Sequence, residues 1–329
     1  MYERKEKRTI VIFFAVIFTA ISFLSLFACK KESELTEEIL EEDFAFSVHF
    51  IDVGEGNSTV VKFSDGKVFL FDVGTESDKN YEKIKSVLEA LSVTEIEYLV
   101  LSHADGEHIG NLSKILDDYS VKTVYMPKIL IKEKYPEFSA VYRKLPEDRI
   151  KNPKCYDYEK GDGYFFAFLY PDLKGNAYAN FNGNLNPTES ERDDVSPIIY
   201  LDCAGVRFIL TADATAAAEE TVREAYGSGV LGTVFNSYGL TVDLNGVDFY
   251  LTASHGDVKS NSEKFLNLIS PKRAVISVGG DNIKGHPSSS VLNRLSAANE
   301  EIEILRTDYF GTISAFIKED GSVSVKKER

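Results

Sequence analysis

Cysteine and histidine are scarce in this chain, and tryptophan is absent. The 329 residues include three cysteines, five histidines and no tryptophan. No two cysteines stand at zinc-finger spacing, so small zinc modules are excluded. A disulfide between Cys155 and Cys203 cannot be assigned from the sequence, and Cys203 lies in an apolar stretch where a buried thiol is common. The thiols therefore identify neither a disulfide scaffold nor a metal site.

Positive charge is also in short supply. The chain has 37 basic and 52 acidic residues, a formal net charge of −15 at pH 7. Proteins that hold duplex DNA tightly normally present a basic face, so this balance argues against that class. A transient anionic substrate is still allowed, because bound metal ions set the local field of a site whatever the net charge of the protein.

Long apolar runs are missing except near the N-terminus. Residues 10–27 are almost entirely apolar, and four basic residues precede them: Arg4, Lys5, Lys7 and Arg8. This arrangement predicts a signal segment over residues 1–28. The run ends in Leu26-Phe27-Ala28-Cys29, which resembles the cleavage box of bacterial lipoproteins and makes Cys29 the candidate lipidation site. An uncleaved membrane anchor is the alternative, and either one tethers the chain to the extracytoplasmic face of a bacterial membrane.

The rest of the chain divides into a short spacer and one large domain. Residues 30–43 contain seven acidic side chains and neither Gly nor Pro, so residues 29–45 are predicted to form a solvated tether, helical or disordered. Residues 46–329 remain as a single domain, and two similar halves would explain its length. Its periodicity predicts helices over residues 81–91, 109–119, 263–269 and 289–298, and Asp65-Gly66 predicts a hairpin turn.

The most informative segment is a polar turn after a buried strand. Four metal-type side chains follow the apolar run 98–101 within six positions: His103, Asp105, Glu107 and His108. Imidazole and carboxylate groups bind Zn²⁺ or Mn²⁺, and this spacing lets one loop offer two ligands to each of two neighbouring ions. A solvated polar turn is the alternative reading.

Three further strand ends carry the same residue types. Asp72, Asp213 and His255 each stand at the end of their own apolar segment. In open α/β sheets, ligand sites lie beyond the carboxyl ends of the strands, so these side chains are expected to converge on the His103 turn. Asp213 and Asp72 could instead be ordinary turn residues, and Asp72 could serve only to brace the loop.

These motifs together resemble the metallo-β-lactamase fold, and within it the hydrolase domains of the ComEC competence DNA-uptake proteins. The matching segments occur in the family's order over about residues 46–316: 48–58, 71–74, the histidine-aspartate signature 102–110, 210–213, 254–256, 271–279, 285–287 and 306–308. The resemblance implies an α/β (α+β) class, with a four-layer αββα sandwich and an internal pseudo-repeat. It also implies a metal site of one or two Zn²⁺ or Mn²⁺ ions bridged by Asp213.

The chain departs from the family pattern at four places. Glu107 and Asn57 stand where family members usually have Asp, and Ser254 replaces the first histidine of a usual pair, leaving His255. No histidine is available as the third ligand of the first ion, for which Asp193 or Asp194 are the nearest candidates. His49 is either a packed core residue or a neighbour that supports a ligand.

The resemblance implies a metal-dependent hydrolase acting through metal-activated water, with phosphodiester hydrolysis as the best fit. Glu107 would steer the attacking water, and His286 would donate a proton to the leaving group. Nucleic acid or a small phosphodiester is the expected substrate, and four basic residues could contact phosphates or be ordinary surface charge: Lys259, Lys272, Arg273 and Lys284. The alternative is a metal-poor lipoprotein of the same fold that binds a ligand or partner without catalysis, and a β-lactamase or lactonase activity is also open. The oligomeric state cannot be read from the sequence.

One segment does not fit an ordinary connection. Residues 171–196 are polar and rich in Gly and Asn, and they are too long for a simple loop. Their position just before an apolar strand predicts either a lid over the site or a disordered surface loop.

Overall fold

Two mixed β-sheets lie face to face in the computed structural model, which describes residues 44–130, 135–171, 188–280 and 282–329. The first sheet has eight strands in the order β15 (Val323–Lys327), β14 (Ile313–Ile317), β1 (Phe46–Phe50), β2 (Thr59–Lys62), β3 (Val68–Phe71), β4 (Glu95–Val100), β5 (Ser120–Tyr125) and β6 (Ile150–Lys151). The second has seven, in the order β13 (Glu303–Arg306), β12 (Arg273–Ile276), β11 (Phe249–Leu251), β10 (Val206–Thr211), β9 (Ile198–Cys203), β8 (Tyr164–Tyr170) and β7 (Tyr158–Gly161). Phe44–Arg329 form one contact unit.

Side chains that point in turn to the two faces of each strand build the core between the sheets. In β3, Phe69 and Phe71 join the aromatic cluster that fills this space, while Leu70 points to the outer face. Phe208 of β10 stacks on Phe249 of β11, with ring centroids 4.7 Å apart, in the same inner layer. Both faces of the central strands are buried, which explains why they read as continuous apolar runs in the sequence.

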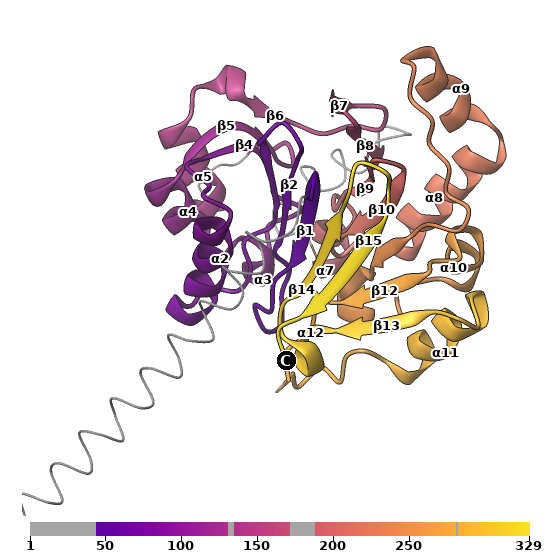
Figure 1. Cartoon of the computed structure of the whole chain (residues 1–329). Coiled ribbons are helices and arrows are strands. Elements are labelled where there is room, and N and C mark those ends of the chain that lie inside the picture. The colour runs from indigo at the N-terminus through magenta and orange to yellow at the C-terminus, as the bar shows by residue number, and fades with distance from the viewer. Residues whose placement is uncertain (1–43, 131–134, 172–187, 281) are drawn as a thin grey trace, which may run out of the picture. The chain divides into compact units, whose positions relative to one another are not determined.

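Helices cover both outer faces and complete a four-layer arrangement. Figure 1 shows α2 (Asp78–Ala90), α4 (Leu112–Asp118) and α5 (Pro136–Lys144) on one side, and α8 (Ala216–Gly227), α10 (Glu263–Ile269) and α11 (Ser289–Ala298) on the other. The remaining helices are α3 (Gly106–Ile109), α7 (Glu189–Asp193), α9 (Val230–Ser237) and α12 (Thr307–Phe310). The αββα sandwich predicted from the sequence is confirmed.

The two sheets repeat one topological pattern. In the first, the antiparallel pair β2–β3 is followed by β4 and β5, both parallel to β3. In the second, the antiparallel pair β9–β10 is followed by β11 and β12, both parallel to β10. The segments after β3, β4, β10 and β11 carry Asp72, His103, Asp213 and His255, so both halves deliver polar side chains beyond the carboxyl ends of parallel strands.

The predicted helices mostly agree with the structure, with one correction. Residues 263–269 and 289–298 form α10 and α11 with the predicted bounds, and residues 65–66 turn between β2 and β3. The helix predicted over 109–119 is divided into α3 and α4. Gly110 packs so closely on Glu76 that a Cβ would lie 2.2 Å from its backbone nitrogen, and Asn111 uses its side-chain amide to bind carbonyl groups of the 73–75 loop. Docking of this loop interrupts the helical periodicity.

Two predicted regions extend outside the described residues. The signal segment, Cys29 and the acidic tether fall within residues 1–43, which the structure does not describe. Of the segment 171–196, residues 171 and 188–196 are described, and the latter contain α7, which begins at a capping box between Thr188 and Glu191. In the described part of the chain, no helix has the length and apolar character needed to cross a membrane.

Candidate metal centre

Strained backbone marks the strand ends that carry the polar side chains. Asp72, Ser254 and His255 all adopt left-handed conformations, with φ of 57°, 48° and 55°. Non-glycine residues rarely adopt this conformation unless the surrounding structure holds them there. The Asp72 N–H bonds to Val100 O at 2.9 Å and the Ser254 N–H to Ala212 O at 2.8 Å, which tie these turns to the neighbouring strand ends.

The predicted ligands gather into two adjacent clusters. In the first, His103 Nε2 lies 4.0 Å from an Asp105 oxygen and 3.8 Å from an Asp193 oxygen. The second contains Glu107, His108, Asp213 and His255, whose ligand atoms all lie within 4.8 Å of one another. The structure therefore brings all six predicted metal-ligating residues together, and of the two further candidates, Asp193 and Asp194, it places Asp193 beside them.

Asp213 lies between the two clusters. One of its oxygens is 3.2 Å from His108 Nε2 and 3.8 Å from His255 Nε2, and the other is 3.8 Å from His103 Nε2. Each carboxylate oxygen therefore faces a different cluster, which is the placement of a bridging ligand.

The imidazoles are held with Nδ1 engaged and Nε2 turned inward. His255 Nδ1 donates to Ser277 O at 2.8 Å, and His108 Nδ1 donates to Asp72 Oδ2 at 2.8 Å. His103 Nδ1 lies 3.0 Å and 3.1 Å from the hydroxyl oxygens of Ser102 and Ser196. For His255 and His108 these bonds engage Nδ1 and leave Nε2 as the ring atom that faces inward, as in many metal-binding histidines.

The inward-facing atoms lack hydrogen-bond partners among the described residues. They are Nε2 of His103, His108 and His255, and Oδ1 of Asp193 and Asp213, all buried. Buried polar atoms are nearly always satisfied, and leaving one unpaired costs about 1–3 kcal/mol. Five such atoms converging on one place, all of metal-ligand type, fit a bound divalent cation.

The charges of the clusters support the same conclusion. Burial together with the nearby Asp213 and Asp105 raises the pKa of Asp193 to about 8. Burial acts to raise the pKa of Asp213 too, but the imidazoles of His108 and His255 hold it far below its usual range. Burial also acts to lower the pKa of His108, yet Asp213 and Asp72 raise it well above its usual value. The carboxylates thus require positive charge among them, which a cation supplies.

Two of the predicted ligands are paired with basic residues from other loops. The guanidinium of Arg192, on α7, donates to both carboxylate oxygens of Asp105. Lys284 Nζ donates to both oxygens of Glu107, at 2.8 Å and 3.0 Å. Arg192 and Lys284 therefore lie at the rim of the clusters, one beside each.

His286 stands next to the clusters and is also held through its Nδ1. This nitrogen lies 3.2 Å from Glu55 Oε1, and Nε2 lies 3.6 Å from Asp257 Oδ2. The hydrogen bond to Glu55 raises the pKa of His286 above its usual value, with burial opposing the shift. The ring of His286 is 6.3 Å from that of His255, so this imidazole lies beside the metal ligands.

Other candidates have different surroundings. His49 is buried between sheet strands with both ring nitrogens near the hydroxyls of Ser47 and Ser314, so it offers no free nitrogen. Asp72 touches His108 and Ser102, whereas the Asp194 side chain accepts a hydrogen bond from Thr215. Asp193, and not Asp194, therefore faces His103.

Lys272 and Arg273 lie at the opposite end of the sheet. Both stand at the amino end of β12, where they pair with Asp248 and Glu303. The clusters lie beyond the carboxyl ends of the strands, so these two residues cannot share a ligand with them. Their role is the ordinary surface charge that the sequence also allowed.

Several contacts of the clusters were not predicted from the sequence. Arg192, Ser196, Glu55, Asp257 and the Ser277 carbonyl all touch a predicted site residue. Arg192 and Ser196 belong to the unusual segment 171–196, whose length was a signal that it reaches the site. The carbonyl of Ser277 has no sequence signal, because every residue has one.

Comparisons of sequence agree with this geometry. The profile of the metallo-beta-lactamase superfamily matches residues 51–280. The chain is 27% identical over 283 residues to ComE operon protein 3 of Bacillus subtilis, a match covering 81% of this chain and 32% of that protein. It is 28% identical over 277 residues to competence protein ComA of Neisseria gonorrhoeae, covering 84% and 33%. The chain thus spans about a third of the length of these curated relatives, and the resemblance predicted from its motifs is confirmed.

Solved structures are more distant. The metallo-beta-lactamase fold protein YhfI of Bacillus subtilis aligns with a TM-score of 0.45 at 8% identity, over 85% of this chain and 99% of that one. Igni18, described as a metallo hydrolase from Ignicoccus hospitalis, aligns with a TM-score of 0.43 at 12% identity, over 85% and 98%.

Proposed function

The chain belongs to the metallo-beta-lactamase superfamily, and from that premise we propose that it is a metal-dependent phosphodiesterase or nuclease. One observation carries the proposal. Five buried nitrogen and oxygen atoms of metal-ligand type, from both halves of the fold, converge around Asp213 and find no hydrogen-bond partner among the residues that the structure describes. A cluster that served only to stabilise the fold would satisfy these atoms with hydrogen bonds.

The residues divide naturally between two ions. His103, Asp105 and Asp193 would hold one, Glu107, His108 and His255 the other, and Asp213 would bridge them. Such ions, when bound, supply an activated water and neutralise charge on the phosphodiester. Three imidazoles and four carboxylates make an oxygen-rich donor set, which suits Mn²⁺ as well as Zn²⁺.

The chain's own residues supply the other requirements of the reaction. His286, whose pKa is raised by the hydrogen bond to Glu55, would give its Nε2 proton to the leaving oxygen. Lys284 and Arg192 each lie beside one of the clusters and could turn from Glu107 and Asp105 to the phosphate oxygens of a substrate. Glu107 would then be released to serve as a ligand.

A phosphodiester is the substrate class that these groups suit best. The reacting phosphate needs charge neutralisation on its non-bridging oxygens, and the clusters are flanked by cations on two sides. The names of the relatives point to competence proteins, which leads us to infer that the substrate is a nucleic-acid strand. A net charge of −15 favours a strand that is bound briefly rather than held tightly.

Metal content and turnover can be measured on the same preparation. The full chain is analysed for metals by elemental analysis and then assayed with bis(4-nitrophenyl) phosphate in added Mn²⁺ or Zn²⁺. We expect at least one tightly bound ion per chain and turnover that a chelator abolishes and the ion restores. A chain that binds no divalent ion and has no turnover would contradict the proposal.

A second candidate function rests on the two rim salt bridges. If Arg192 and Lys284 keep Asp105 and Glu107 engaged, the clusters bind too little metal for catalysis. The chain would then be a ligand- or partner-binding protein of the same fold. Elemental analysis separates the two candidates, because only the hydrolase requires stoichiometric metal.

For the cellular location, we propose attachment to the outer face of a bacterial membrane. Support comes from the sequence of residues 1–29, with its basic start, apolar run and Cys29. Metabolic labelling with a radioactive fatty acid, compared between the parent chain and Cys29→Ala, tests lipidation. Loss of label in the variant is the expected result. If the parent chain and the variant carry the same amount of label, Cys29 is not the lipidation site, and the chain has either an uncleaved helical anchor or no anchor.

A further inference from the structure

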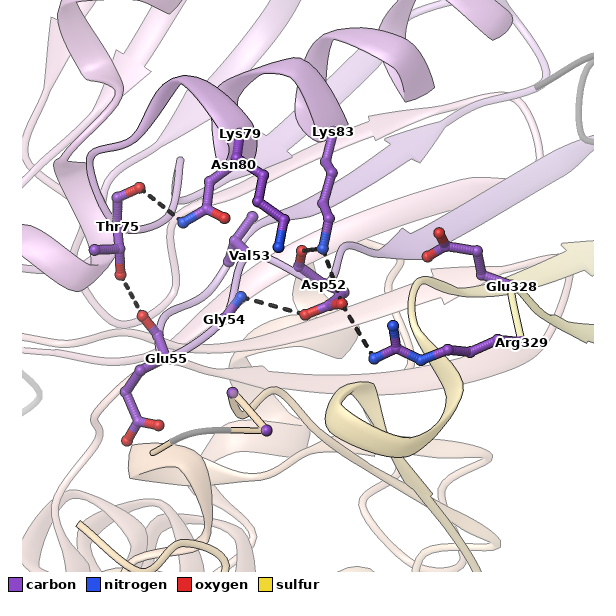
Figure 2. A pocket seen from close by; sticks show the side chains of 12 residues that line it. Asp52, Val53, Gly54, Glu55, Thr75, Lys79, Asn80, Lys83, Glu328 and Arg329 are labelled. Atoms are coloured by element: carbon purple, nitrogen blue, oxygen red, sulfur yellow. Dashed lines mark hydrogen bonds and ion pairs between the residues drawn. The ribbon is translucent and has the colours of Figure 1, made fainter. Parts of the chain in front are cut away.

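A separate cavity of about 440 Å³ opens beside the metal centre. Its walls come from the loop after β1, the first turns of α2, the 279–280 loop and the end of the chain. Figure 2 shows Lys79 and Lys83 extending from α2 toward the turn at Asp52, and Arg329 reaching the same turn from the other side. Three basic side chains from distant parts of the sequence thus share one cavity.

Asp52 holds two of these cations in place. Lys83 Nζ donates to the Asp52 backbone oxygen at 2.6 Å and to its carboxylate at 2.8 Å. The guanidinium of Arg329 lies 3.5 Å from the same carboxylate and donates to the backbone oxygens of Thr307 and Asp308. One negative charge therefore orients two positive ones.

Lys79 adds a third positive charge. Within the described parts of the chain, its ammonium group has no hydrogen bond or ion pair. The two other acidic residues of the lining are engaged elsewhere: the Glu55 carboxylate binds His286, and the Glu328 carboxylate accepts the Thr312 N–H. The lining therefore carries three basic and three acidic side chains, and among the described residues Lys79 is the cation of the cavity without an acidic partner.

Glu55 connects the cavity to the metal centre. Glu55 lines the cavity, and Figure 2 shows its carboxylate pointing away from Lys79 and Lys83. The carboxylate lies 3.2 Å from His286 Nδ1. Gly279 closes the wall between them: a Cβ at this position would lie 3.0 Å from Glu55 N. The cavity and the catalytic histidine are therefore separated by a single side chain.

We propose that this cavity is a phosphate subsite, in which Lys79, Lys83 and Arg329 bind the phosphate group next to the one that is hydrolysed. The inference rests on the proposed function and specifies its substrate class: a phosphodiester that carries a second phosphate, such as an oligonucleotide. Each nucleotide of a strand brings one backbone charge, so a strand with one phosphate at the metals places another within reach of a neighbouring site. The volume is within the range of small-ligand pockets and accommodates a nucleotide.

Binding can be tested without turnover. The probe is a fluorescein-labelled thymidine dinucleotide with a methylphosphonate linkage, which is not hydrolysed, made with or without a terminal 5′- or 3′-phosphate. Its affinity for the metal-loaded full chain is measured by fluorescence anisotropy. A charge-assisted contact to the terminal phosphate is expected to tighten binding by roughly three- to tenfold at low salt.

Matched variants assign the effect to the cavity. Lys79→Ala should remove the gain from the terminal phosphate, and Lys79→Arg should retain most of it. Lys85→Ala is the control, since Lys85 belongs to the same helix but pairs with Glu89 and Asp118 outside the cavity. The inference is overturned if the terminal phosphate gives no gain with either end, or if Lys79→Ala and Lys85→Ala reduce the gain equally.

The two proposals fail in different ways. If the chain has no metal-dependent turnover but the Lys79-dependent gain is observed, the phosphate subsite stands and the proposed reaction falls. If turnover is present but the gain is absent, the hydrolase stands and the subsite falls.

Discussion

Two aspartates occupy corresponding positions in the two halves of the molecule but have opposite surroundings. Asp72 follows β3 and Asp213 follows β10, each at the point where an antiparallel pair gives way to parallel strands. The Asp72 carboxylate accepts hydrogen bonds from the Ser102 N–H, the Ser102 hydroxyl and His108 Nδ1. Oδ1 of Asp213 is buried and has no hydrogen-bond donor in the described parts of the chain.

The difference separates two tasks that the same side chain can perform. A carboxylate whose lone pairs are used by the protein positions its neighbours, and here Asp72 orients His108. A carboxylate whose lone pairs are directed at other ligand atoms is placed to bind a cation. The hydrogen bonds that each carboxylate accepts, rather than its position in the repeat, therefore distinguish the aspartate that braces the site, Asp72, from the one that is placed to bind a cation, Asp213.

Removing the binding aspartate should have the largest effect. Asp213→Ala takes away the ligand shared by both clusters, so we expect loss of stoichiometric metal and a fall in kcat/KM of roughly 10³-fold or more. Metal analysis and the nitrophenyl phosphodiester assay measure both effects. Asp202→Ala, at the β9–β10 turn on the far end of the same strand pair, should retain metal and activity. Equal losses in the two variants would mean that general destabilisation is responsible.

The pair of His286 and Glu55, which lies next to the metal ligands, also consists of a histidine held by a carboxylate. Substitutions in this pair should have the second-largest effect. We expect His286→Gln to lower kcat by roughly 10²-fold if this imidazole is the proton donor. Since Glu55 raises the pKa of His286, activity should be maintained below that pKa and fall as the pH rises through it. Glu55→Gln removes the stabilising charge, so the fall should move to lower pH while kcat in acid is preserved.

A pH–rate profile of the parent, Glu55→Gln and His286→Gln checks this order of effects. An alkaline limb that is unchanged in Glu55→Gln would show that His286 is not the group that titrates, and that Glu55 does not brace it.

The bracing aspartate should have a smaller effect on metal than Asp213 and a larger one on folding. Asp72→Ala leaves three donors without their acceptor, and we expect roughly 10- to 100-fold weaker metal binding. Stability should fall by about 1–3 kcal/mol for the lost buried interactions, as measured by urea denaturation. Asp72→Asn keeps one acceptor oxygen and should lie between the parent and Asp72→Ala in both measurements. Similar metal affinities for Asp72→Ala and Asp213→Ala would remove the distinction between the two aspartates.

The smallest effect is expected at the rim. Lys284 pairs with Glu107 at the partly exposed surface, where such an ion pair contributes about 0–1 kcal/mol to stability. Lys284→Ala should therefore leave the melting temperature nearly unchanged but raise KM for a phosphodiester by roughly two- to fivefold, the size of one exposed phosphate contact. Lys272→Ala, at the opposite end of β12, is the control and should leave KM unchanged. If both variants change KM equally, the effect is one of net charge and not of a contact.

Much of this architecture could be predicted from the chain, because local patterns record it. Apolar runs that end in Asp or His located the strands and the side of the sheet where ligands meet, and the spacing of His103, Asp105, Glu107 and His108 identified one loop with four ligands. The bounds of α10 and α11 followed from their periodicity. The helix break at Gly110 did not, since it depends on close packing against the loop at Glu76.

The sequence alone determined the family, the layered fold and the residue types of the metal centre, because strand alternation and motif spacing are properties of neighbouring residues. Only the tertiary structure decided that Asp193 rather than Asp194 faces His103, that Arg192 and Lys284 engage Asp105 and Glu107, and that Lys79, Lys83 and Arg329 share a cavity. The physical reason is that a carboxylate or an ammonium group takes its role from the charges and donors around it, and those come from segments far apart along the chain.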